Sequence, residues 1–150
     1  MAGWPDIRID TNREYSLCFV CGKKNPVGLH VAIRKNKDKI IGEFISRKEH
    51  EGPRGLLHGG LIAALLDEVM VHLAHAVISP GQDTPTASLS IRFHRPVPTG
   101  KKIILEAIIS GKHSKLIQAQ ASIKFEDGTL VAKAEGKFMI INSELKDFKK

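Results

Sequence analysis

The sequence predicts an α+β domain in which an antiparallel sheet of about six strands wraps around one long central helix. One observation is the segment from Gly55 to Val77, which is apolar almost all the way round, as in a helix that is covered on all sides. The other is a set of segments in which apolar and polar residues alternate, as in half-buried strands. The 150 residues fit a single domain, with a core at about 16–142 and short extensions at both ends.

Two strands are expected before the helix, at 28–35 and 38–46, with a polar turn at residues 36–38 between them. Four longer strands are expected after it, at 86–94, 101–110, 116–125 and 130–141. In the first of these four strands, apolar and polar residues alternate strictly, so they fall on opposite faces. The apolar face contains Ala87, Leu89, Ile91 and Phe93. The polar face contains Thr86, Ser88, Ser90, Arg92 and His94. The pair Asp127-Gly128 predicts a tight hairpin turn. Such short connections imply antiparallel neighbours, because a parallel crossover needs about a dozen residues.

The net charge of +7 favours anionic partners. Nucleic acid is not the expected one, because the basic residues are scattered and only 5% of the residues are aromatic. A phosphorylated small molecule, such as a nucleotide or coenzyme A, would be attracted by the same positive net charge.

The cytoplasm is the expected location. The stretch MAGWPDIRIDTNREYS lacks the basic-then-apolar pattern of a signal peptide. No membrane span is expected either, because the longest apolar segment is interrupted by Asp67, Glu68, His72 and His75.

The two cysteines, Cys18 and Cys21, form one C-x-x-C pair. A structural zinc site needs four ligands, and a redox pair would normally begin a helix, whereas turn-forming residues follow here. The favoured interpretation is a pair of reduced thiols packed in a turn, so that no metal is expected. The alternative is a metal whose site is completed by another chain or by histidines.

Glycines at the start of the helix leave its backbone bare. Gly59 and Gly60 follow His58, where unpaired N–H groups and the positive end of the helix dipole can bind an oxyanion. The same glycines could simply permit a tight entry into the helix. The motif alone does not separate these two interpretations.

Two adjacent acids, Asp67 and Glu68, lie in the middle of this apolar helix. A buried acid is costly unless it is paired or functional. The two side chains point about 100° apart, and Glu68 can bond His72 one turn later. A metal site on Glu68, His72 and His75 is a weaker alternative. Asp67 has no such local partner and is therefore a catalytic candidate.

The spacing of His58 and Asp67 indicates whether one chain or two chains would form an active site that contains both. Nine residues in one helix separate them by about 13 Å, too far to act on the same carbon atom. If both ends are functional, the site is shared between two chains. The helix surface that the sheet leaves uncovered should also meet a second copy, so a homodimer or homotetramer is expected.

Three segments together resemble a known family. HEGPRGLLHGGLIAALLDEVM, TASLSIRFHRPVPTGKKI and CFVCGKKNPVGL are similar to sequences of the hotdog-fold acyl-CoA thioesterases, in particular their phenylacetate-pathway-like branch. The resemblance covers about residues 16–142. It implies the hotdog fold, an acyl-CoA substrate, and no cofactor beyond the coenzyme A of that substrate.

The resemblance also implies roles for individual residues. Asp67 would act as nucleophile or as the base for water, and the Gly59 amide of the other subunit would polarise the thioester carbonyl. His58 would shape that end, and Thr86 would hold the attacking water or the acid. Gly60 and Leu61 are expected to contact the substrate.

One departure from the family pattern concerns Gly52, at a position where some relatives carry a polar side chain. His50 or Glu51 could substitute for it. The departure motivates the alternative of a non-catalytic module that binds acyl-CoA as a sensor or carrier. A hydratase is a weaker alternative, because no suitable Asp/His pair is present.

Overall fold

The computed structural model describes residues 16–142. The expected absence of a signal peptide concerns residues 1–16, which lie outside the described residues except for Ser16. Six strands form one sheet in the order β1-β2-β5-β6-β7-β4, with every neighbouring pair antiparallel. Their bounds are β1 Ala32–Asn36, β2 Lys39–Ile45, β4 Thr86–Phe93, β5 Lys102–His113, β6 Leu116–Phe125 and β7 Leu130–Met139. The predicted α+β architecture is confirmed.

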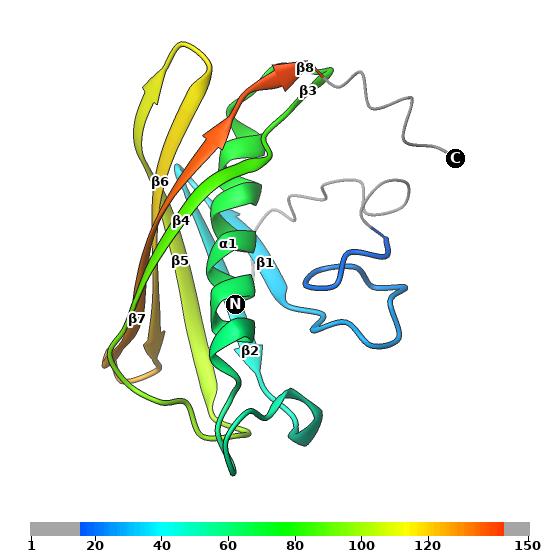
Figure 1. Cartoon of the computed structure of the whole chain (residues 1–150), viewed down its shortest axis with the longest axis vertical. Helices are drawn as coiled ribbons and strands as arrows, with labels where there is room; N and C mark the ends of the chain where they lie inside the picture. Colours follow the sequence, from blue (N-terminus) through cyan, green and yellow to red (C-terminus); the bar gives the residue numbers. More distant parts are fainter. Residues whose placement is uncertain (1–15, 143–150) are drawn as a thin grey trace.

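The central helix α1 (Gly59–Ala76) lies along the concave side of the sheet (Figure 1). Leu65, Leu66, Val69 and Met70 are fully buried against the alternating inward residues of the strands. The helix approaches β7 closely: a Cβ on Gly136 would lie 3.2 Å from the Met70 Cε atom. The core therefore sits between α1 and the sheet.

By length and composition α1 would also suit a membrane-crossing helix, with 18 residues of mean hydropathy 1.3. The core helix of a globular protein satisfies the same criteria, and α1 packs against five strands of the sheet.

The helix begins at Gly59 rather than at the predicted Gly55. Gly55 has a φ of +68°, outside the helical region, and Leu56 and Leu57 form bridges to Pro98 and Glu51. A short 3-10 helix, η1 (Lys48–His50), precedes this loop. The apolar pattern extended the predicted helix because Leu57 is buried in the core although it is not helical.

Two other boundaries differ from the prediction. The strand expected from residue 28 begins at Ala32, because the Leu29 and Val31 amides donate to the carbonyls of Phe19 and Val20 instead of a sheet neighbour. The last strand ends at Met139. After Ile140, a separate short strand, β8 (Ile141–Asn142), pairs with an unpredicted strand, β3 (Gln82–Asp83).

Strand β4 departs from the predicted alternation. Its register on β7 shifts between Thr86 and Ser88, so that Thr86 lies opposite Phe138 while Leu89 lies opposite Gly136. Residues directly opposite each other share a face of the sheet, and Phe138 is fully buried. Thr86 therefore faces α1 together with Leu89, and its expected position on the polar outer face is wrong. A β-bulge of this kind re-aims side chains without a clear signal in the residue pattern.

Candidate active site

One backbone amide at the start of α1, that of Gly59, donates no hydrogen bond to any group among residues 16–142. His58 is the N-cap, and its Nδ1 atom accepts a hydrogen bond of 2.8 Å from the Gly60 N–H. Gly59 is exposed, so its N–H and the positive end of the helix dipole face outward. The arrangement fits the oxyanion-binding interpretation of the glycines.

Gly52 has a packing role beside this helix start. A Cβ on Gly52 would lie 3.1 Å from the His58 Cδ2 atom and 3.2 Å from its Cα atom. A larger residue would therefore press on the side chain that caps the helix. The close approach of His58 therefore favours glycine at position 52.

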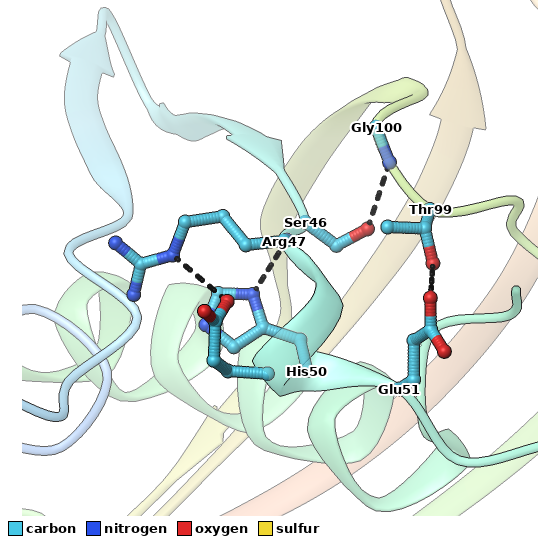
Figure 2. A network of polar contacts seen from close by, with 7 residues as sticks. Ser46, Arg47, His50, Glu51, Thr99 and Gly100 are labelled. Atoms are coloured by element: carbon cyan, nitrogen blue, oxygen red, sulfur yellow. Dashed lines mark hydrogen bonds and ion pairs between the residues drawn. The ribbon is translucent and has the colours of Figure 1, made fainter.

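The residues next to Gly52 belong to a polar network that joins the loop before α1 to the loop before β5 (Figure 2). The Nδ1 atom of buried His50 accepts a 3.0 Å hydrogen bond from the Arg47 N–H, and the Glu51 carboxylate accepts one of 3.0 Å from Thr99. Burial, and then the charge of Arg47, lower the pKa of His50, which favours a neutral ring. Both side chains therefore have structural partners here.

Asp67 lies half-buried in the middle of α1, and its Oδ1 atom accepts a 2.8 Å hydrogen bond from the Thr86 hydroxyl on β4. Burial raises the pKa of Asp67, the Thr86 hydrogen bond opposes the rise, and the charge of Glu68 adds to it. A carboxylate with a raised pKa, held by one neutral donor, suits a general base or a nucleophile. The contact that the family resemblance implied is present, and the catalytic roles of both residues stay predictions.

We expect Thr86→Val to move the acidic limb of the kcat/KM profile of any Asp67-dependent reaction to higher pH. The variant loses the donor that stabilises the charged carboxylate, so the pKa of Asp67 rises further, and the active ionised form is lost at a higher pH. The measurement is kcat/KM against pH for both proteins. Thr129→Val is the control, since Thr129 bonds Asp127 in the distant β6–β7 hairpin. An acidic limb shifted equally by both variants would contradict the role of Thr86.

Glu68 has the predicted partner. The His72 Nε2 atom lies 2.9 Å from the Glu68 Oε1 atom, one helical turn along α1. Burial raises the pKa of Glu68, but the hydrogen bond and charge of His72, with hydrogen bonds from Cys21 and Cys18, outweigh it and hold this pKa below its usual range. Burial, and then the charge of Glu68, raise the pKa of the Cys21 thiol. Sequence reasoning missed these cysteines as neighbours of Glu68.

Strand β4 runs alongside α1 and touches both ends of the candidate site. Near one end of β4, a Cβ on Gly59 would lie 3.8 Å from the Phe93 ring, and at the other end Thr86 bonds Asp67. Both features therefore lie on the β4 side of α1. They remain two turns of helix apart, about 12 Å. One chain therefore contains both the Gly59 amide and the Asp67 carboxylate, but the two groups are too far apart to act on the same atom.

The predicted substrate-binding residues lie at the same helix end as Gly59. Gly60 is exposed, with its amide occupied by His58, and Leu61 packs against the edge of the core. A broad concavity on the outer face of the sheet has both polar and apolar walls, and Gly59, Asp67 and Thr86 are not part of its lining. The candidate active site therefore lies on the helix side of the sheet.

Comparison with known proteins adds family evidence. Residues 54–132, more than half of the chain, match the model of the thioesterase superfamily. The bovine (Bos taurus) acyl-coenzyme A thioesterase THEM4 is 25% identical over 129 residues, which are 84% of this chain and 52% of that protein. The chain thus spans about half the length of this relative.

Solved structures show the same fold. A phenylacetic acid degradation-related protein of Ralstonia eutropha superposes with a TM-score of 0.68 at 24% identity, over 74% of this chain and 85% of that one. A Streptococcus mutans protein bound to acetyl CoA superposes with a TM-score of 0.68 at 17% identity, over 75% of this chain and 89% of that one. The predicted hotdog fold is confirmed.

Proposed function

Because this chain belongs to the thioesterase superfamily, we propose that it hydrolyses the thioester bond of an acyl-coenzyme A. The observation that carries the proposal is the arrangement on one side of α1. An amide donor without an acceptor among residues 16–142 lies at the helix start, and a carboxylate held by Thr86 lies two turns later. An oxyanion donor and a carboxylate base or nucleophile are two groups that can promote hydrolysis of a thioester.

The active site of the proposed enzyme is shared between two subunits. β4 is the last strand of the sheet, and two of its inward residues are poorly covered, with exposures of 37% for Leu89 and 52% for Phe93. A second copy that pairs antiparallel along β4 about a two-fold axis would cover them. The same pairing brings the Phe93 end of one subunit to the Thr86 end of its partner. The Gly59 amide of one chain then approaches Asp67 of the other.

In the reaction, the Gly59 N–H donates to the thioester oxygen and stabilises the negative charge that develops there. Asp67 either takes a proton from an attacking water or attacks the carbonyl carbon itself, and water then releases the acyl group. In both cases the carbon–sulfur bond breaks, and the products are a carboxylic acid and the free thiol of coenzyme A. Thr86 holds the Asp67 carboxylate in place, and His58 holds the helix start.

The basic charge of the chain suits the coenzyme A part of the substrate. A net charge of +7 raises the local concentration of an anion that carries several phosphate charges. The acyl group would lie between the subunits, beside Leu61 and the apolar surface of α1.

The direct test is release of free thiol from a panel of acyl-CoA esters of different chain length and aromatic character. We expect turnover of at least one class, and a thermal midpoint that rises in the presence of coenzyme A, because a ligand of the folded state stabilises it. Absence of thiol release across the panel would contradict the proposed activity.

The second candidate is a non-catalytic module that binds acyl-CoA as a sensor or carrier, and the observation that favours it is Gly52. The polar side chain that some relatives carry at this position is absent, and the neighbouring His50 and Glu51 already bond the Arg47 N–H and the Thr99 hydroxyl. Saturable binding of acyl-CoA without turnover in the same panel would favour this function over hydrolysis.

A further inference from the structure

A second cluster of reactive side chains lies beside α1, on the segment that precedes β1. The sulfur atoms of Cys18 and Cys21 and a carboxylate oxygen of Glu68 all lie within 4.8 Å of one another. The Cys18 sulfur is 3.5 Å from the Glu68 Oε1 atom, although 50 residues separate the two in sequence. Neither the oxyanion end of α1 nor Asp67 is part of this cluster.

The turn that carries the two cysteines is tightly built. The Gly22 amide donates a 2.8 Å hydrogen bond to the Cys18 carbonyl, and the Lys24 amide donates one of 3.0 Å to the Ser16 carbonyl. A Cβ on Gly22 would lie 2.6 Å from the Ser16 oxygen, so only glycine fits at this position. The backbone of the turn is thus well defined, and its two sulfur atoms lie within 4.8 Å of each other.

The turn is also anchored to the fold. The Leu29 amide donates to the Phe19 carbonyl at 2.8 Å, and the Val31 amide donates to the Val20 carbonyl at 3.0 Å. Val20 and Cys21 are buried in the core. In Figure 1 this segment (dark to light blue) lies on the side of α1 away from β5, β6 and β7. The sulfurs are therefore held against the helix and not on a free loop.

Glu68 is oriented by the helix that carries it. Its side chain is 13% exposed, and His72, at 8%, holds its Oε1 atom from the next turn. Carboxylates that bind a metal are themselves usually hydrogen-bonded to a second group, and His72 makes such a contact with Glu68. Two soft sulfur donors and one carboxylate, brought together from two separate elements, form a ligand set that suits zinc.

We propose that Cys18, Cys21 and Glu68 bind one zinc ion, with water in the fourth position and His72 as the residue that orients Glu68. Binding replaces the two thiol protons, which leave to solvent. Zinc–sulfur bonds of about 2.3 Å in a tetrahedral site place the ligand atoms about 3.3–3.8 Å apart, so small side-chain rotations close the site. The ion would link the segment before β1, which carries Cys18 and Cys21, to the middle of α1. Its ligand there, Glu68, is the residue that follows Asp67.

The first measurement is the metal content of the full chain purified without chelator. We expect near-stoichiometric zinc, and a thermal midpoint that falls when a strong chelator removes it and recovers when zinc is restored. In Cys18→Ser and in Glu68→Gln the zinc content should fall at least severalfold. Glu106→Gln is the matched control, because Glu106 pairs with Lys39 on the sheet, outside the cluster, and its zinc content should equal that of the unchanged chain.

The second measurement keeps the proposal testable if a variant folds poorly. Cobalt(II) added to the reduced, zinc-free chain should produce thiolate-to-cobalt charge-transfer absorption that saturates near one equivalent and is displaced by zinc. Three results would overturn the proposal: no retained zinc together with no such absorption, absorption that is the same in Cys18→Ser, or a Cys18–Cys21 disulfide that forms again after reduction in the presence of zinc.

Discussion

Asp67→Asn is expected to lower kcat/KM for acyl-CoA hydrolysis by about 10²–10⁴-fold, the range that a positioned general base contributes. Asparagine keeps the shape of the side chain and can still accept the Thr86 hydrogen bond, but it can neither take a proton nor attack a carbonyl. The measurement is thiol release under initial-rate conditions. Asp38→Asn, in the exposed β1–β2 turn, is the control and should be unaffected. Full turnover in Asp67→Asn would remove this acid from the mechanism.

The same substitution should not destabilise the fold at neutral pH. The pKa of Asp67 is raised in the folded state, mainly by burial, so folded protein binds more protons than unfolded protein between the two pKa values. Stability then falls as the pH rises through that interval, and the ionised carboxylate costs stability above it. Asp67→Asn should therefore unfold at an equal or higher temperature than the unchanged chain. Loss of activity with a retained thermal midpoint separates a catalytic role from a structural one.

Gly59→Pro is expected to lower kcat by about 10²–10³-fold, the effect of removing one oxyanion donor. Proline removes the N–H, and the first position of a helix tolerates it because that amide has no helical partner. His58, with φ −61° and ψ 132°, already has the extended conformation that a residue before proline requires. The substitution therefore deletes the donor with little change to the backbone.

Gly59→Ala is the matched control for this donor. It keeps the N–H, and its Cβ would meet only the Phe93 ring, at an ordinary distance of 3.8 Å. We expect the alanine variant to retain most of the activity and the proline variant to lose it, with similar thermal midpoints. Equal losses in both variants would show that Gly59 matters for space and not for its amide.

The sequence predicted the parts of the molecule that depend on periodicity. The apolar helix and the alternation of β6 follow from burial, and Ile117, Ala119, Ala121 and Ile123 are all buried as expected. The hairpin at Asp127-Gly128 is also present, with Gly128 at a φ of +88°. These features depend on local preferences that each segment carries in its own residues.

The parts that were missed depend on contacts between distant segments. The bulge in β4 turns Thr86 towards Asp67, and strict alternation placed this residue on the wrong face. The approach of Cys18 to Glu68 depends on how the segment before β1 folds back onto α1. Side-chain periodicity contains no information on either, because each is set by the packing of one element on another.

The central claim, that one active site takes Gly59 from one subunit and Asp67 from its partner, is tested most directly by complementation. Asp67→Asn and Gly59→Pro chains with different affinity tags are produced together, and the heterodimer that carries both tags is isolated and assayed for thiol release. A shared site predicts about half of the activity of the unchanged dimer, since one of the two sites in the heterodimer has both groups intact. If each site were built within one chain, the heterodimer would be as inactive as the two variants alone, and that result would contradict the account.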